Sequence, residues 1–258
     1  MDYFVISLLA CCAWFFGSVA AGGAALIFII AGSFFLPLPL IPILLSVIGT
    51  VSGVYRVFLY YPSINFSVAK WLVAGTLIGA FAGAKIFSSL IGEQYGHIIE
   101  MVLSVVLFIS GGYGLFSARI LKFPVRHSYF FFCSLFTSVL SGITGAGGII
   151  INILFQRTSM TPKEIVGTKS FGNFILQFAK LVAYVVVVDR SDVLKLVPDR
   201  TEFEIGGLVM CGIVGSILGS YLGKRYLDQI DGQKFDQIMN VAFILFGVCF
   251  FLKSLSVI

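Results

Sequence analysis

The sequence predicts an all-α integral membrane protein built from two repeated helical units, and three observations predict it. Of the 258 residues, 59% are hydrophobic and only 11% are charged, whereas about a quarter of the residues in soluble domains are charged. Apolar stretches of roughly 20 residues, long enough to cross a bilayer as a helix, follow one another with short linkers. The two halves of the chain also share a pattern of glycines and polar residues.

Two of the apolar segments are too long for a single straight crossing. The segments lie near 3–35, 40–61, 68–91, 97–117, 127–157, 163–188, 203–226 and 233–255. At about 1.5 Å per residue, a straight helix over 3–35 would measure roughly 50 Å, against a hydrocarbon core of about 30 Å. Both 3–35 and 127–157 carry a glycine cluster, where we expect the helix to break or to fold back.

The two halves of the chain match at fixed separations, which indicates a repeat. At 125 positions, the glycine clusters pair Gly17 with Gly142, Gly22 with Gly147, and Gly23 with Gly148. At 140 positions, Gly75, Gly79 and Gly83 pair with Gly215, Gly219 and Gly223. The four-residue spacing of this second set favours close packing of helices. The larger separation reflects a polar insertion at 189–204, so we expect repeats at 1–122 and 123–258.

The path of the long segments decides the topology. A broken helix that continues gives four crossings per repeat, whereas a re-entrant hairpin gives three, and only the odd number inverts the second repeat. With hairpins, one side of the membrane holds nine basic loop residues and the other holds five. The nine are Lys70, Arg119, Lys122, Arg126, Arg157, Lys163, Lys224, Arg225 and Lys234. With full crossings the split is eight to six. The positive-inside rule therefore favours hairpins, inverted repeats and termini outside the cytoplasm.

Two predicted helices carry a polar stripe, each within an arc of roughly 80°. The stripes consist of Lys169, Asn173, Gln177 and Lys180 in 163–188, and of Ser46, Gly49, Gly53, Arg56 and Tyr60 in 40–61. A cation at mid-membrane costs at least about 2.5 kcal/mol, and the one acidic residue of these segments, Glu164, lies at a helix start. An anionic ligand would supply the missing charge. Alternatively, the cations extend to the membrane interface, and the two amides bind neighbouring helices.

The glycine clusters offer a second way to hold an anion. A helix that restarts after Gly22-Gly23 or Gly147-Gly148 presents free backbone N–H groups and the positive end of its dipole; the alternative is a kink without a ligand. The sequence contains no motif for ATP binding or hydrolysis, and its five cysteines lack metal-ligand spacing. The net charge of +5 is spread over short loops, which favours membrane orientation over nucleic-acid binding. We expect no cofactor, metal or catalytic site.

Two motifs of the second half are similar to those of a known family. Gly142-Ile143-Thr144-Gly145-Ala146-Gly147-Gly148, then Pro162 and Val166-Gly167-Thr168-Lys169-Ser170, resemble the glycine-rich segment and the P…VGTS element of the sulfite exporter TauE/SafE family. The resemblance extends over essentially the whole chain, although the first half has no VGTS at 42–46. It implies a carrier of sulfite, sulfoacetate, organosulfonates or related anions in the bacterial inner membrane, driven by an ion gradient, with an asymmetric site.

We therefore expect a multi-pass secondary transporter in which the glycine breaks and polar stripes meet around one small anion, and which works by alternating access. The expected substrate-binding residues are Gly22, Gly23, Ser46, Arg56, Gly147, Gly148, Lys169, Ser170, Asn173, Gln177 and Lys180. The expected coupling ion is a proton or sodium. The alternatives are an anion channel, a membrane scaffold that assembles a partner, and an intramembrane enzyme, for which the apolar segments offer no acid/base or nucleophile pair.

Overall fold

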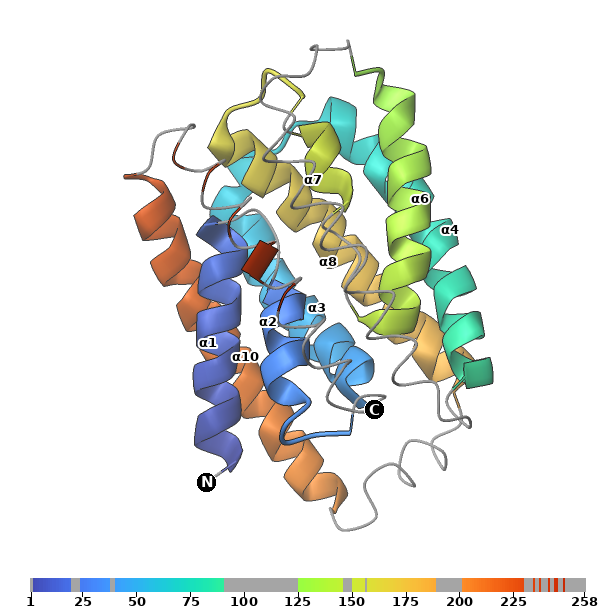
Figure 1. The fold of residues 1–258 in the computed structure, drawn as a ribbon, viewed down its shortest axis with the longest axis vertical. Coiled ribbons are helices and arrows are strands. Elements are labelled where there is room, and N and C mark those ends of the chain that lie inside the picture. The colour runs from blue at the N-terminus through green and yellow to red at the C-terminus, as the bar shows by residue number, and fades with distance from the viewer. Residues whose placement is uncertain are drawn as a thin grey trace.

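The predicted all-α membrane fold is confirmed for the part of the chain that the structure describes. The computed structural model describes residues 2–19, 24–37, 40–90, 125–145, 150–155, 157–188 and 201–229, with positions 234, 237, 241, 244, 245 and 248. Every regular element within these ranges is helical (Figure 1). By length and composition, four helices within the described ranges could cross a membrane: Leu40–Ser63, Phe66–Ser89, Pro162–Val187 and Phe203–Leu227. The apolar segment expected at 97–117, and most of the one at 233–255, lie outside the described residues.

The helices follow the order of the predicted segments. They are α1 (Asp2–Val19), α2 (Ala24–Gly32), α3 (Leu40–Tyr60), the 3-10 helix η1 (Tyr61–Ser63), α4 (Phe66–Leu90), α6 (His127–Thr144), α7 (Ile150–Phe155), α8 (Pro162–Val187) and α10 (Glu202–Leu227). Each of the two long predicted segments is thus divided, 3–35 between α1 and α2 and 127–157 between α6 and α7. The predicted breaks at the glycine clusters are confirmed.

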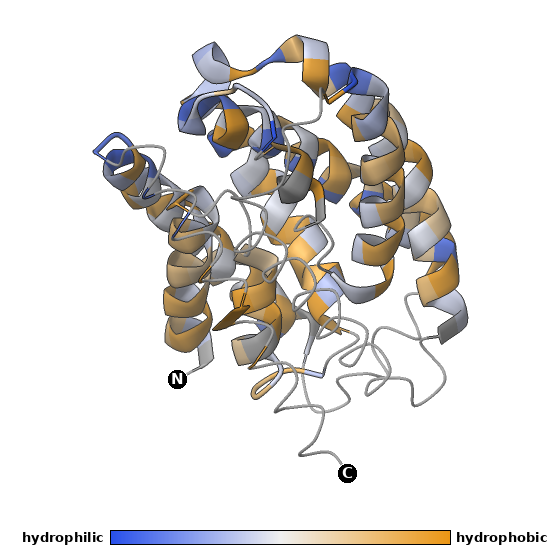
Figure 2. Ribbon diagram, turned by 45° about the horizontal axis from the view of Figure 1, so that its top comes forward, coloured by the Kyte–Doolittle hydropathy of each residue, from blue (hydrophilic) through white to orange (hydrophobic). Residues whose placement is uncertain are grey.

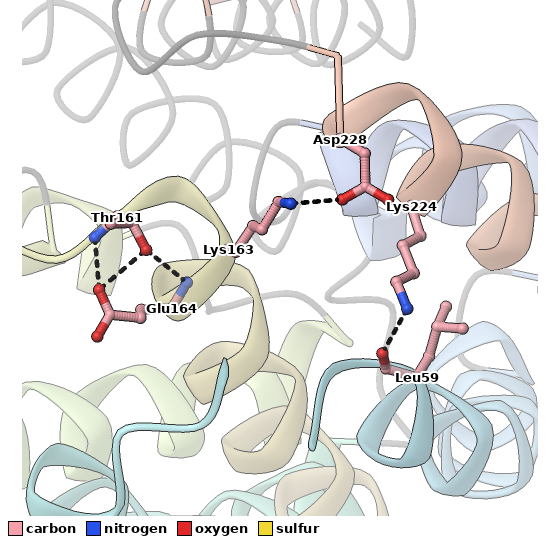
Figure 3. Close-up of polar contacts among 6 residues, drawn as sticks. All are labelled: Leu59, Thr161, Lys163, Glu164, Lys224 and Asp228. Carbon is pink, nitrogen blue, oxygen red and sulfur yellow. Dashed lines mark hydrogen bonds and ion pairs between the residues drawn. The ribbon is translucent and has the colours of Figure 1, made fainter. Parts of the chain in front are cut away.

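Local sequence explains where several helices begin and end. Thr161 starts α8 with a capping box, in which its backbone N–H donates to Glu164 Oε2 at 2.8 Å and its Oγ1 accepts from the Glu164 N–H at 3.3 Å (Figure 3). Thr201 and Glu204 start α10 in the same way. Gly145 ends α6 with a φ of 85°, a left-handed conformation that glycine adopts without strain.

In each half, the short helix runs back along the first helix. The Trp14 ring packs edge-on against Phe28 with centroids 6.2 Å apart, and Gly17 faces Ala24 across the same pair, so α1 and α2 are antiparallel. Phe155, the last residue of α7, packs against Phe130 in the first turn of α6, with centroids 5.0 Å apart. Neither long segment therefore continues as one straight crossing.

The first helix of each half packs against the last described long helix of the other half, α1 against α10 and α6 against α4 (Figure 1). Both contacts use the glycine series, because a Cβ at these positions would overlap backbone carbonyls of the neighbouring helix. Gly75, Gly79 and Gly83 face the carbonyls of Phe131, Leu135 and Val139, whereas Gly215, Gly219 and Gly223 face those of Ser7, Cys11 and Phe15. The prediction of close helix packing is confirmed.

These contacts divide the long helices into two groups with opposite directions. Helices α1, α3 and α10 share one direction, since Gly212 faces Ile48 and Lys224 reaches the Leu59 carbonyl. Helices α4, α6 and α8 share the other, since Gly172 faces Leu72 and Ser88 donates to the Val187 carbonyl. The groups meet where α3 and α8 cross antiparallel, with Gly49 against Gln177 and Gly167 against the Tyr60 carbonyl.

One end of the bundle is polar and basic. Here α3 and α10 end and α4, α6 and α8 begin, and hydrophilic residues gather there in Figure 2. The Lys163 Nζ lies 2.9 Å from Asp228 Oδ1, and the Lys224 Nζ donates to the Leu59 carbonyl at 2.9 Å (Figure 3). The described basic residues at this end include Lys70, Arg126, Arg157, Lys163, Lys224 and Arg225. They all belong to the larger basic set from the sequence.

Candidate functional site

A cavity of about 110 Å³ lies between the two helix groups. Because a water molecule needs about 10–15 Å³ of such space, the cavity has room for several waters or for one small solute. Its polar lining residues are Arg56, Thr76, Ser134, Thr137, Ser138, Ser141, Lys169, Ser170, Asn173 and Gln177. Most of the remaining wall is apolar and includes Trp14, Leu26, Leu45 and Phe155. None of the described lining residues is acidic.

The Arg56 side chain extends from α3 into the cavity and does not extend to a membrane interface. Its side chain is 7% exposed, and its Nη2 donates to the carbonyl of Gly17, in the last turn of α1, at 3.3 Å. A cation is favourable there, because the carbonyl end of a helix carries partial negative charge. The Nε is buried and has no hydrogen-bond partner among the described residues. Arg56 therefore presents a free N–H group inside the protein. Its burial contradicts the alternative in which the side chain extends to the membrane interface.

The polar stripe of α8 forms one wall of the cavity, from Lys169 and Ser170 to Asn173 and Gln177. Gln177 is 3% exposed, and it fits because its partner on α3 is Gly49, where a Cβ would lie 2.7 Å from Gln177 Cγ. The Ser170 Oγ and the Gln177 Oε1 are buried and have no hydrogen-bond partner among the described residues. Buried polar atoms of this kind are costly unless a ligand or water satisfies them.

Of the predicted site residues that the structure describes, two do not line the cavity. Lys180 is fully buried, and its Nζ lies 3.5 Å from the Oγ of Ser141, which itself lines the cavity. Ser46 is also fully buried and donates to the Ile43 carbonyl at 2.6 Å. Gly22, Gly23, Gly147 and Gly148 lie outside the described residues. Immediately after the first glycine cluster, Ala24 and Ala25 at the start of α2 line the cavity.

Sequence reasoning missed the hydroxyl groups of α6. Ser134, Thr137, Ser138 and Ser141 are spaced at i, i+3, i+4 and i+7, which places them on one helix face, and all four line the cavity. This spacing inside the apolar segment 127–157 was the signal that could have found them. Residues of α6 and α1 that make matching helix contacts are 124 positions apart in the sequence. At the α1 positions that correspond to these four hydroxyl residues, the chain has Ala10, Ala13, Trp14 and Gly17. The hydroxyl groups on this face of α6 therefore have no counterparts at those positions of α1.

The cavity combines positive charge, neutral donors and apolar surface. Arg56 and Lys169 supply the charge, and hydroxyl groups of α6, Thr76 and Ser170 supply donors. Cationic and neutral donors without a carboxylate suit a small anion, because hydrogen bonds to a charged group are stronger than neutral ones. Within the described ranges, no cluster of three or more His, Cys, Asp or Glu residues could hold a metal ion.

The similarity of the chain to a known protein family agrees with a site for a small anion. A family model described as "Sulfite exporter TauE/SafE" matches residues 6–250, which is nearly the whole chain. No curated protein and no solved structure matches the chain significantly.

Proposed function

The chain belongs to the sulfite exporter TauE/SafE family, and on this premise we propose that it is a secondary transporter of a small anion such as sulfite, sulfoacetate or another organosulfonate. The observation that carries the proposal is the state of Arg56. Its buried Nε, on a cavity whose described lining has no acidic residue, has no hydrogen-bond partner among the described residues. A bound oxyanion would accept from this N–H group and balance its charge.

In the proposed complex, Arg56 and Lys169 carry the charge that neutralises the anion, while Ser170, Asn173 and Gln177 orient it. Backbone N–H groups after the glycine breaks complete the site, from Gly22 and Gly23 in the first half and from Gly147 and Gly148 in the second. Lys180 contributes positive charge from behind Ser141, and Ser46 supports α3 beside the site.

The proposed mechanism is alternating access by two inverted repeats, 1–122 and 123–258, in a bacterial inner membrane. Support comes from the opposite directions of α1 and α6 and from the antiparallel crossing of α3 and α8. Movement of one helix group against the other would open the cavity between them to either side. The basic end of the bundle, with Lys163 and Lys224, would face the cytoplasm. The N-terminal end of α1 would then lie outside it.

Transport by the purified full chain in liposomes tests the proposal. We expect uptake of at least one labelled anion among sulfite, sulfoacetate, taurine and small carboxylates under a proton or sodium gradient. Uptake that saturates with anion concentration would support a carrier, whereas flux that keeps rising in proportion would indicate a channel. No uptake and no binding of any of these anions would contradict transport and favour a scaffold.

Ser138 is expected to donate to the anion from the α6 wall. Ser138→Ala removes one hydroxyl with little change in volume, and a hydrogen bond to a charged group contributes about 1.5–3 kcal/mol. We therefore expect about tenfold weaker binding of the transported anion, measured by titration calorimetry. Ser89→Ala is the matched control, because Ser89 is an exposed residue in the last turn of α4 and donates within its own helix. Equal affinities of the two variants would remove Ser138 from the site.

A further inference from the structure

Lys180 lies directly behind the cavity, at the broken end of α6. Its Nζ is 3.5 Å from the Ser141 Oγ, and the Ser141 hydroxyl donates to the carbonyl of Gly145 at 3.4 Å. Ser141 lies in the last turn of α6 and lines the cavity. The fully buried amine is therefore separated from a bound solute by one hydroxyl group, and it lies beside the negative, carbonyl end of a helix.

The corresponding position of the first half also holds a cation. Arg56 lies 124 positions before Lys180 and donates to the carbonyl of Gly17 at the end of α1. In transporters with broken helices, such carbonyl ends are where a coupling cation is held. Here the chain places its own side chains there. The two differ in one respect, because an arginine keeps its proton in proteins whereas a lysine can release it.

The described helices around Lys180 offer no negative side chain to balance an ammonium group. α3, α4 and α6 contain no Asp or Glu, and the one acidic residue of α8, Glu164, is held by Thr161 at the far end of the helix. Apart from Glu164, the charged groups that accompany Lys180 on these helices are positive: Arg56 on α3, Lys169 on α8, the exposed Lys70 and Lys85 on α4, and the exposed Lys163 on α8, which pairs with Asp228.

The remaining titratable groups nearby are neutral or distant. The Tyr184 hydroxyl, one turn along α8, donates to the Gly142 carbonyl at 2.6 Å. The titratable residues of α6, from His127 to Cys133, lie in its first two turns, far from Ser141 in its last. On α3, Tyr55 and Tyr60 lie beside Arg56 in sequence, whereas α8 meets α3 near Gly49 at the level of Gln177. No negative side chain in the part of the chain that the structure describes lies as close to Lys180 as an anion in the cavity would.

We propose that Lys180 is the coupling-proton site of the transporter: its amine binds a proton from cavity water through the Ser141 hydroxyl when an anion occupies the cavity, and releases it when the anion leaves. The anion and the ammonium group then stabilise each other, and the coupling is reciprocal. One negative charge and one proton enter together, so the occupied cavity carries the same net charge as the empty one. This inference rests on the proposed function.

Proton uptake on anion binding tests the inference. The probe is methanesulfonate, which has no titratable proton near neutral pH, so protons taken up are bound by the protein. We expect calorimetry of the purified full chain in two buffers of different ionisation enthalpy to show uptake approaching one proton per anion. We also expect affinity to strengthen by up to about tenfold for each unit by which the pH falls.

Two variants assign the proton. Lys180→Arg keeps a cation at the position that corresponds to Arg56 of the first half, and we expect it to bind methanesulfonate with no proton uptake and no pH dependence. Lys85→Arg, an exposed control on α4, is expected to retain the uptake. Size-exclusion profiles and thermal unfolding check that each variant is folded.

Several outcomes overturn the inference. Methanesulfonate binding to the wild type without proton uptake overturns it whatever the variants do, and leaves the proposed function intact. Uptake that persists in folded Lys180→Arg, or that disappears in folded Lys85→Arg, also overturns it. If neither methanesulfonate nor any anion of the transport screen binds, both the inference and the proposed function fail.

Discussion

Replacing Arg56 with alanine is expected to weaken anion binding by at least about 30-fold and to abolish measurable transport. Loss of one partner from a buried, hydrogen-bonded charge pair costs about 2–5 kcal/mol, and every 1.4 kcal/mol is about tenfold in affinity. Arg56 is 7% exposed and is the cavity-lining cation of the first half, with its Nε available to an anion. Affinity for the transported anion, measured by calorimetry, checks the expectation.

Arg56 also binds the carbonyl end of α1, so the experiment must separate binding from folding. Arg56→Lys keeps the positive charge at Gly17 but removes the Nε, and we expect it to fold normally while binding the anion more weakly than the wild type. Arg225→Ala is the matched control, because Arg225 is exposed in the last turn of α10. Equal anion affinities of Arg56→Ala and Arg225→Ala, with both proteins folded, would refute the assigned role.

Replacing Gly219 with alanine is expected to destabilise the fold by more than about 2 kcal/mol. The added Cβ would overlap the backbone carbonyl of Cys11 on α1. A carbonyl cannot rotate away as a side chain can, so α1 and α10 would have to separate along their interface, and overpacking of this kind typically costs about 1–3 kcal/mol. Thermal unfolding in detergent, or titration with SDS, measures the change.

The same helix provides the control for this prediction. Gly206 lies on α10 too, but a Cβ there would meet no atom within 4 Å. Gly206→Ala is therefore expected to be neutral or stabilising by up to about 1 kcal/mol, because alanine has the higher helix propensity. If Gly219→Ala and Gly206→Ala have the same stability, close contact between α1 and α10 is not what the glycine series provides.

Much of the fold followed from two kinds of pattern in the sequence. The length of the apolar segments and their glycine clusters predicted the helix breaks. At one of them, α6 ends at Gly145, which has a left-handed conformation. The spacing of Gly75, Gly79 and Gly83 predicted close helix contact but could not say with which helix. That choice depends on long-range packing, and periodicity within one segment contains no information about it.

The lining of the cavity could be predicted in part, for a physical reason. One helix face can be read from spacing, so the prediction brought Lys169, Asn173 and Gln177 together, and all three line the cavity. Lys180 shares that face but lies three turns beyond Lys169, past the end of the cavity lining on α8, where it meets Ser141. The hydroxyl groups of α6 were missed because serine and threonine are unremarkable in membrane helices until their shared face is counted.

The exchange of helices between the halves has a consequence for biosynthesis. During translation α1 emerges well before α10, yet α10, which ends at Leu227, is the helix that covers the Ser7, Cys11 and Phe15 carbonyls of α1. After insertion into the bilayer, α1 therefore lacks its partner helix until about two hundred further residues have been synthesised. In a polypeptide truncated before α10, the face of α1 that packs against α10 would remain uncovered. Supplying α10 and the residues after it as a separate chain should restore the contact.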